Sequence, residues 1–287
     1  MELLHRSLRH APLFALLACA FLLIAFTLAL GDPPAADSSA PALSLSPFDT
    51  SLVSAPSFEV FDVASGTVIA ARDAESVRPI ASVTKLITAS AFVDHADMHA
   101  TTTITQGDVA TEGEAGGLKA GDAYQNRDLL YPLLLSSSND AASVMLRADP
   151  MLLGDMEMLA VSAEGDHTRF FDPSGLSREN VSTALSLAKI GSMLYRTHPY
   201  IFDITRLGEF MGAHGGWVNN NPVAGEKGYR GGKHGYTPEA GHTIVAFFDE
   251  PVAGNATRTI GYVLLGSADL KGDIDALRRE VQKNVRF

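Results

Sequence analysis

The chain has 287 residues, of which 46% are hydrophobic and 19% are charged, a balance typical of a globular protein with a substantial core. Acidic side chains outnumber basic ones, 33 to 22, and the net charge is −11. Nucleic-acid binding is therefore not expected, because neutralising phosphates requires clustered Lys and Arg. The same charge disfavours docking on anionic membrane surfaces. Cys19 is the only cysteine, so no internal disulfide can form.

The N-terminal segment has the composition of an export sequence. Basic side chains between positions 5 and 10 precede an apolar run over residues 11–30, and Asp32 follows it. As a helix, this run would span the roughly 30 Å hydrocarbon core of a bilayer, with the rest of the chain outside. The run is longer than a usual signal core, so we favour an uncleaved membrane anchor over residues 1–31. The alternatives are a signal cleaved near Gly31 and a weak lipoprotein box ending at Cys19.

Each of these alternatives predicts export. The protein would be anchored to the outer face of the cytoplasmic membrane, or secreted if the leader is cleaved. Residues 32–56, rich in Pro, Ala and Ser, predict a linker with no packed structure of its own. Folded sequence then begins with two strands, 58–63 and 67–70, joined by a tight turn at Gly66.

A helical block follows this hairpin. The predicted helices cover 82–93, 126–135, 139–146 and 183–195. Ser182 is the expected N-cap of the last of them. Strand patterns return over residues 228–237, 243–248 and 259–265. A final helix is indicated by apolar residues spaced to share one face, namely Ile274, Leu277, Val281 and Val285.

The order of these elements indicates an α+β fold in which both ends of the chain build one antiparallel sheet. The terminal helices would cover this sheet, and residues from about 101 to 199 would form an inserted helical subdomain. A cleft is expected where the subdomain meets the sheet.

The first candidate catalytic motif is Ser82-Val83-Thr84-Lys85. Three residues apart on a helix is nearly one turn, so the serine and the lysine share a face. Ser82 would lie at the helix N-terminus, where free N–H groups favour developing negative charge. Lys85 can take the seryl proton if its pKa falls from about 10.4 towards 7. The pattern alone carries little weight, because Ser186 and Lys189 repeat it within a predicted helix.

Two further motifs follow in order along the chain. Ser137-Ser138-Asn139 falls on a short loop between two predicted helices, where side chains can project into a cleft or simply cap a helix. Lys233-His234-Gly235-Tyr236-Thr237 falls on a predicted strand. A glycine in a strand allows a ligand to approach the backbone, whereas a lysine there is equally typical of a solvated edge.

Together the three motifs resemble those of the serine D-alanyl-D-alanine carboxypeptidase family, the low-molecular-mass penicillin-binding proteins. The similarity covers about residues 57–285 and includes the segments Ile80–Thr88, Leu133–Ala142, Phe171–Leu176, Ser182–Ala184 and Tyr236–Gly241. It implies a β-lactamase/transpeptidase-like fold, with a five-stranded antiparallel sheet flanked by helices, and a catalytic domain over residues 57–287.

By this resemblance, Ser82 attacks the D-Ala-D-Ala carbonyl and becomes acylated, with Lys85 as its base. Ser137 relays a proton to the departing D-Ala, and Asn139 holds the donor peptide and orders Lys85. The substrates are peptidoglycan stem peptides, and β-lactams are covalent inhibitors. Neither a metal nor an organic cofactor is required.

The resemblance also implies that the third motif binds substrate. Lys233 adds positive charge beside the substrate carboxylate, and the backbone N–H groups of Ser82 and Tyr236 hold the oxyanion. The substrate-binding strand comprises Lys233, His234, Gly235, Tyr236 and Thr237.

The chain departs from the family pattern in several places. His234 stands where relatives usually have Thr or Ser, and an imidazole titrates near pH 6.5. Its protonated form is expected to bind a carboxylate better, so substrate affinity is expected to rise on the acid side. An arginine that relatives place after the last core strand is matched only weakly, by Lys271. Many relatives also carry a C-terminal β-rich domain and membrane helix; the sequence predicts neither here, so any anchor is expected to be N-terminal.

Three other functions remain open. A serine β-lactamase of class A usually carries E-x-x-L-N, which this sequence lacks, and the class C motif is matched only formally by Tyr124-Gln125-Asn126. An inert cell-wall-binding module would be expected to have lost some of the motif residues, which all remain. A DD-endopeptidase would use the same chemistry on cross-linked peptides.

Overall fold

The computed structural model describes residues 44–45, 48–113, 116–252 and 256–286. The anchor or signal predicted over residues 1–31 lies outside them and stays a prediction. Within the described part of the chain, no helix is both long and apolar enough to cross a bilayer.

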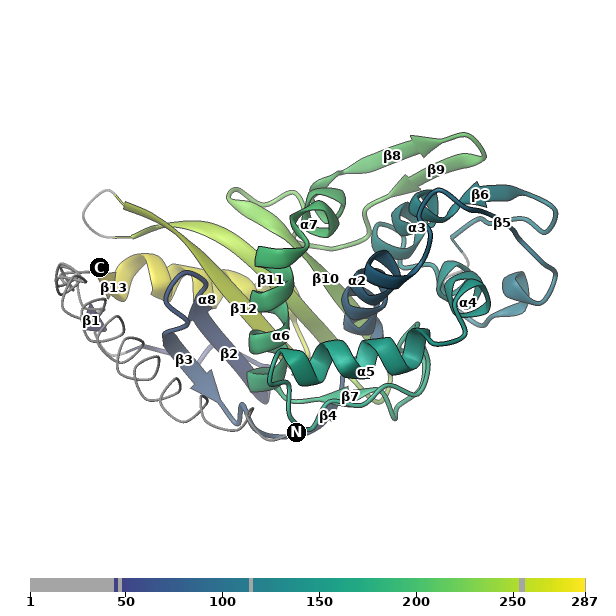
Figure 1. Ribbon diagram of the computed structural model, residues 1–287. Helices are drawn as coiled ribbons and strands as arrows, with labels where there is room; N and C mark the ends of the chain where they lie inside the picture. The colour runs from purple at the N-terminus through teal and green to yellow at the C-terminus, as the bar shows by residue number, and fades with distance from the viewer. Residues whose placement is uncertain (1–43, 46–47, 114–115, 253–255, 287) are drawn as a thin grey trace, which may run out of the picture. The chain divides into compact units, whose positions relative to one another are not determined.

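A five-stranded antiparallel sheet forms the centre of the fold, in the order β10-β11-β12-β2-β3 (Figure 1). Two of its strands come from the N-terminal side of the chain, β2 (Ser57–Asp62) and β3 (Val68–Arg72). Three come from the C-terminal side, β10 (Tyr229–Thr237), β11 (Gly241–Val252) and β12 (Ala256–Ser267). Because β2 pairs with β12, both ends of the chain build one sheet, which confirms the predicted α+β fold class.

Helices lie on both faces of the sheet. The α-helices are α2 (Thr84–His95), α3 (Leu130–Leu134), α4 (Asn139–Ala148), α5 (Leu152–Ser162), α6 (Ala184–Thr197), α7 (Pro199–Arg206) and α8 (Leu270–Asn284). Short 3₁₀ turns precede or connect them, η1 (Ala81–Val83), η2 (Asp108–Ala110) and η3 (Asn126–Leu129). Figure 1 shows α8 against one face and α6 against the other.

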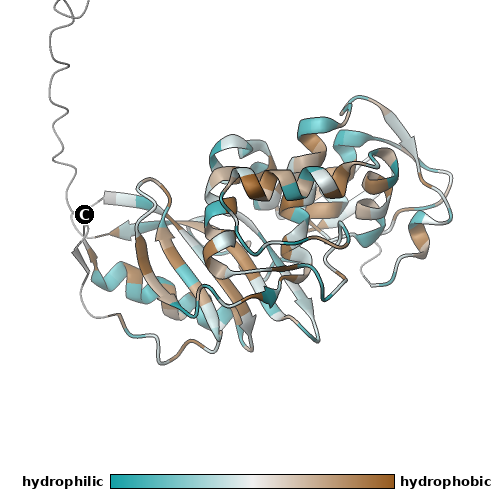
Figure 2. Cartoon of the chain, turned by 60° about the horizontal axis from the view of Figure 1, so that its bottom comes forward, coloured by the Kyte–Doolittle hydropathy of each residue, from teal (hydrophilic) through white to brown (hydrophobic). Residues whose placement is uncertain are grey.

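Side chains along β11 point alternately to the two faces of the sheet, so this one strand contributes to two hydrophobic cores. Ile244, Ala246 and Phe248 are buried in the core that includes α8. Val245 and Phe247 are buried in the larger core formed with α2 and α6. Figure 2 shows the hydrophobic colouring running along the strands, as expected for a sheet covered on both faces.

Four small two-stranded sheets complete the described structure. They are β1 (Ser44–Leu45) with β13 (Val285–Arg286), β4 (Arg78–Pro79) with β7 (Val181–Ser182), β5 (Thr101–Thr103) with β6 (Ala123–Gln125), and β8 (Glu209–Gly212) with β9 (Gly215–Val218). The β5–β6 pair lies in the region expected to be mainly helical. Its strands have only three residues each, too few for an alternating pattern to be recognised.

The predicted cap of α6 is wrong by one residue. The hydroxyl of Thr183, not that of Ser182, accepts the N–H of Ser186, at 3.0 Å. Ser182 belongs to β7, and its Oγ lies 2.8 Å from Thr168 Oγ1. The helix begins at Ala184, so Thr183, whose backbone is extended, occupies the N-cap position and Ser182 lies one residue too early.

The prediction of an unpacked linker over residues 32–56 is wrong for its described end. Val53 and Ala55 are buried in the core that includes α8. The backbone N–H groups of Ser54 and Ala55 donate to the Asp273 carboxylate, at 2.6 and 2.9 Å. On the other side, the Arg72 guanidinium binds the carbonyls of Val53 and Ala55. Packed structure therefore begins before β2.

Candidate active site

Ser82 lies in the 3₁₀ turn directly before α2, at the helix N-terminus that the sequence predicts. The preceding residue, Ala81, has a φ of +47°, a left-handed conformation that non-glycine residues rarely adopt. Two glycines pack against this strained turn. A Cβ at Gly175 would overlap the carbonyl of Ala81, and one at Gly235 would overlap the backbone nitrogen of Ser82. Only glycine permits either approach.

Lys85 is fully buried on the face of α2 that carries Ser82. Its Nζ donates to Ser82 Oγ at 2.9 Å, to Asn139 Oδ1 at 2.8 Å and to the Ser174 carbonyl at 2.6 Å. An ammonium group has three N–H donors. A neutral amine needs only two of them for Asn139 and Ser174, which leaves its lone pair for the Ser82 hydroxyl. The arrangement thus fits proton transfer from Ser82 to Lys85.

The second motif connects α3 to α4. Asn139 is the first residue of α4, and its Nδ2 donates to the Glu112 carbonyl at 2.7 Å, which turns Oδ1 towards Lys85. Capping is performed by Ser138, whose Oγ accepts the N–H of Ala141 at 3.0 Å. Ser137 is buried with a φ of +61°. Capping of α4 and contact with Lys85 therefore fall on neighbouring residues of one motif, Ser138 and Asn139.

The third motif occupies β10, an edge strand of the sheet. Lys233 is only 1% exposed, which excludes a solvated edge lysine, and its Nζ donates to the His234 carbonyl at 2.8 Å. Gly232 donates its N–H to Thr205 Oγ1 at 3.0 Å, which fixes the strand to α7. Further along, Gly235 contacts the Ser82 turn and Tyr236 is 58% exposed.

Ser174 was not assigned a role from the sequence, although Phe171–Leu176 belongs to the family resemblance. Its carbonyl is fixed by a loop built around Asp172, whose carboxylate accepts the N–H groups of Ser174, Gly175 and Ser177 at 2.7 Å each. Burial alone would raise the pKa of Asp172, but these hydrogen bonds outweigh it and hold the pKa below its usual value. The Asp-Pro-Ser-Gly sequence, a typical turn, was the available signal.

The sequence pattern of the D-alanyl-D-alanine carboxypeptidase family matches residues 46–257. The chain belongs to this family. DacB2, a D-alanyl-D-alanine carboxypeptidase of Mycobacterium tuberculosis, is 35% identical over 120 residues, which is 41% of each protein. A D-alanyl-D-alanine endopeptidase of Pseudomonas aeruginosa is 29% identical over 78% of this chain and 76% of its own.

Solved structures agree with this assignment. The crystal structure of a D-alanyl-D-alanine carboxypeptidase from M. tuberculosis H37Rv is 27% identical, with a TM-score of 0.73 over 82% of this chain and 93% of that one. The protein is thus a serine peptidase of the D-alanyl-D-alanine carboxypeptidase family, and the predicted transpeptidase-like fold is confirmed.

The second Ser-x-x-Lys pattern lies elsewhere in this carboxypeptidase-family fold. Ser186 stands in the first turn of α6, where its hydroxyl donates to the Asp166 carbonyl. Lys189 forms an ion pair with Glu164, at 3.6 Å. Neither residue contacts the Ser82 turn through these bonds, so this second Ser-x-x-Lys pattern is a chance match.

Two other weak matches are also accounted for. Tyr124, of the formal class C motif, packs its ring against His214 and Trp217, with centroids 4.7 and 6.3 Å away. Lys271 pairs with Glu226 and Asp275, at 2.5 and 3.2 Å, in the first turn of α8. Its charge is matched locally, so the structure gives no support to Lys271 as the missing arginine.

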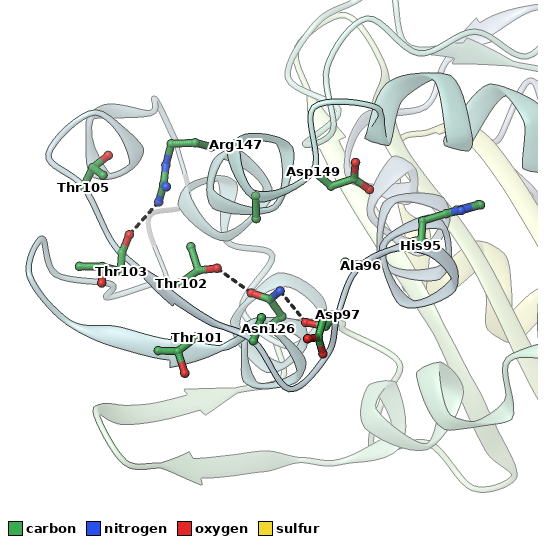
Figure 3. A pocket seen from close by; sticks show the side chains of 12 residues that line it. His95, Ala96, Asp97, Thr101, Thr102, Thr103, Thr105, Asn126, Arg147 and Asp149 are labelled. Atoms are coloured by element: carbon green, nitrogen blue, oxygen red, sulfur yellow. Dashed lines mark hydrogen bonds between the residues drawn. The ribbon is translucent and has the colours of Figure 1, made fainter.

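A cavity of about 580 Å³ between the ends of α2 and α4 and strand β5 contains no residue of the three motifs shared with the family (Figure 3). Its polar groups are largely matched to one another. Asn126 binds Thr102 Oγ1 and the Asp97 carbonyl, and Arg147 binds Asp108 and the Thr103 carbonyl. With these groups engaged, the cavity is not a candidate catalytic site.

The structure overturns the expected titration of His234. Burial lowers the pKa of its imidazole to about 3, and the charges of Lys233, His242 and Lys85 add to this effect. No described residue forms a hydrogen bond with its buried Nδ1. Because the pKa lies far below pH 5, the imidazole of the free enzyme is neutral throughout the physiological range.

We therefore expect no acid-side rise in kcat/KM from His234. The pH profiles of the unmodified protein and of His234→Thr should have the same shape between pH 5 and 8, because kcat/KM reports groups of the free enzyme. The measurement is kcat/KM on a D-Ala-D-Ala peptide across this range. An inflection near pH 6 that only His234→Thr removes would contradict a neutral imidazole.

Asp140, next to Asn139 in α4, is a buried carboxylate with no donor to either oxygen among the described residues. Burial raises its pKa to about 6, and the nearby Asp108 carboxylate contributes. The folded state therefore holds this proton to a higher pH than the unfolded state does. Stability is lost as the pH rises from about 4 to 6, and the penalty persists above that.

Asp140→Asn should remove this penalty. We expect the variant to gain about 1–3 kcal/mol in the free energy of unfolding at pH 7.5 and little at pH 4. The helix dipole stabilises a carboxylate in the first turn of α4, and Asp140→Asn loses this contribution. The gain in the free energy of unfolding should therefore lie towards the lower end of this range. Urea unfolding at both pH values measures it, and an equal effect at both would show that Asp140 does not titrate in this window.

Proposed function

We propose that this peptidase removes the terminal D-Ala from peptidoglycan stem pentapeptides through an acyl-enzyme at Ser82. The observation that carries the proposal is the buried Lys85 amine, which contacts the Ser82 hydroxyl and is oriented by Asn139 and Ser174. A base in hydrogen-bond reach of a nucleophile, itself oriented by other groups, is the arrangement that nucleophilic catalysis requires.

In the acylation step, Ser82 Oγ bonds to the carbonyl carbon of the penultimate D-Ala while Lys85 takes the hydroxyl proton. The negative charge on the carbonyl oxygen is held by the backbone N–H groups of Ser82 and Tyr236. The close packing of Gly235 on the Ser82 turn supports this pairing of backbones. The bond to the terminal D-Ala then breaks as Ser137 gives its hydroxyl proton to the departing amine and takes the proton held by Lys85, which leaves Lys85 neutral.

In the deacylation step, water attacks the ester while the neutral Lys85 amine takes a proton from it. The bond to Ser82 Oγ then breaks, the shortened peptide leaves as its carboxylate, and Lys85 returns the proton to Ser82. The substrate carboxylate would lie beside Lys233 and His234 of β10. Since the His234 imidazole is neutral in the free enzyme, it contributes a hydrogen bond, and the positive charge comes from Lys233. β-Lactams, whose strained amide imitates the scissile bond, would acylate the same serine.

Cleavage of cross-linked peptides is a second candidate, because a relative aligned over 78% of this chain is a D-alanyl-D-alanine endopeptidase. Purified pentapeptide monomers and cross-linked dimers should be digested separately and the products identified by mass. Release of free D-Ala from monomers supports a carboxypeptidase, and conversion of dimers to monomers supports an endopeptidase. No product from either substrate would contradict both.

A β-lactamase is distinguished by the lifetime of the penicillin acyl-enzyme. A lifetime of hours supports the peptidase and one of milliseconds supports a lactamase.

We further propose that the catalytic domain works outside the cytoplasmic membrane, where its substrate lies, and that residues 1–31 anchor it or direct its secretion. Fractionation of cells producing the full chain tests this location, and recovery of the protein with the cytoplasm would contradict it.

A further inference from the structure

The β8–β9 hairpin makes one contact with the catalytic region that the proposed mechanism does not use. Trp217 of β9 is 5% exposed, and its indole Nε1 donates to the Gly116 carbonyl at 2.7 Å. Gly116 has a φ of +72°, and a Cβ there would overlap the side chain of Ser138. The indole therefore holds the backbone at Gly116 directly against the second motif.

Glu112 and Gly113, which come before Gly116 in the chain, contact Asn139. The Glu112 carbonyl accepts the Asn139 Nδ2–H at 2.7 Å, and a Cβ at Gly113 would lie 2.8 Å from that nitrogen. The opposite end of the amide, Oδ1, accepts from Lys85 at 2.8 Å. Glu112 thus fixes which end of the Asn139 amide faces the amine of Lys85.

An aromatic cluster fixes the direction of the indole. Phe210 of β8 stacks on Tyr131 of α3, with centroids 3.5 Å apart and planes within 9°. Trp217 lies parallel to Phe210, with centroids 6.3 Å apart and planes within 7°. Since α3 leads into the Ser137-Ser138-Asn139 loop, the hairpin and the motif share one support.

We propose that Trp217 is a positioning residue for acylation. By holding Gly116 against Ser138, it fixes the residue directly before Asn139, and through Asn139 it orients Lys85 towards Ser82. The inference rests on the proposed function, in which Lys85 is the base for Ser82. Loss of the indole N–H leaves the Gly116 carbonyl without its donor, and the effect should appear in bond formation more than in binding.

Pre-steady-state acylation by a fluorescent penicillin separates bond formation from binding. The rate constant k2 measures bond formation, and the dissociation constant Kd measures binding. Trp217→Phe keeps an aromatic ring and removes only the donor. We expect k2 to fall about tenfold, the effect of one hydrogen bond, with Kd within about twofold. Gly116→Ala should lower k2 similarly by pushing the backbone off Ser138. His214→Ala, on the same hairpin but bonded to the Ala123 carbonyl, is the matched control and should keep k2 within about twofold.

A double-mutant cycle distinguishes positioning from a general loss of stability. If both residues act through one path, the Trp217→Phe/Gly116→Ala double variant should be no slower than the slower single variant. Independent, multiplying losses would overturn the proposal, as would an unchanged k2 in Trp217→Phe. If Trp217→Phe does not fold, a normal k2 in Gly116→Ala overturns it equally. Absence of labelling in the unmodified protein would instead contradict the proposed function.

Discussion

Replacing Lys85 with methionine should lower the second-order rate constant of acylation by penicillin about 1,000-fold, within the range that general-base catalysis contributes. Methionine fills nearly the same space but cannot accept the Ser82 proton. The Asn139 and Ser174 oxygens lose a donor, which costs about 1–3 kcal/mol each at a buried site, while the cost of burying the polar amine disappears. The fold should therefore persist. Stopped-flow labelling measures the rate, and circular dichroism reports the fold.

Lys189→Met is the matched control, because Lys189 belongs to the second Ser-x-x-Lys pattern and pairs with Glu164. Its acylation rate should equal that of the unmodified protein. A loss below about tenfold in Lys85→Met would mean that Lys85 is a structural residue and that another group takes the proton, since a base is expected to contribute at least about 100-fold.

Of the substitutions proposed for this protein, Arg278→Ala should produce the largest loss in the free energy of unfolding. Glu250 of β11 is completely buried, and its carboxylate accepts from Arg278 Nε at 2.5 Å and from Gln282 Nε2 at 2.6 Å. The guanidinium also lies 4.0 Å from the centre of the Phe248 ring. Removing it leaves an uncompensated buried charge, which costs about 3–5 kcal/mol. At about 2–4 °C per kcal/mol, Tm should fall by at least roughly 6 °C.

Arg279→Ala is the control, since Arg279 neighbours Arg278 on α8 but is exposed. It should change the free energy of unfolding by no more than about 0.5 kcal/mol. The double variant Glu250→Leu/Arg278→Met should be more stable than Arg278→Ala, because neither charge remains buried alone. Equal stability of Arg278→Ala and Arg279→Ala would show that the buried pair contributes nothing.

The sequence predicted those parts of the fold that repeat a pattern. Alternating apolar residues gave the strands of the central sheet, and the spacing of Ile274, Leu277 and Val281 gave α8. The β8–β9 hairpin was not predicted from the sequence. Each of its strands has only four residues, and glycines interrupt the alternation of apolar and polar residues. Trp217 is the only buried residue of β9. The hairpin's aromatic side chains pack on the rings of Tyr124 and Tyr131, which are remote in sequence.

For the site, motif order and family resemblance identified the groups, but not what orients them. The Ser174 carbonyl that binds Lys85 is a backbone atom 89 residues away, and no residue type marks such an acceptor. The pKa of His234 depends first on burial and then on the charges of Lys233, His242 and Lys85, and the sequence does not show this burial, so the expected acid-side rise in affinity was not a safe inference. Distances between remote segments decide both features.

Covalent capture of the acyl-enzyme tests the central claim most directly. The unmodified protein, incubated with benzylpenicillin, should gain the mass of one penicillin molecule, and the adduct should map to the peptide that contains Ser82. Ser82→Ala, with its fold retained, should gain no mass. An adduct that persists in Ser82→Ala, or that maps to Ser186, would contradict Ser82 as the nucleophile.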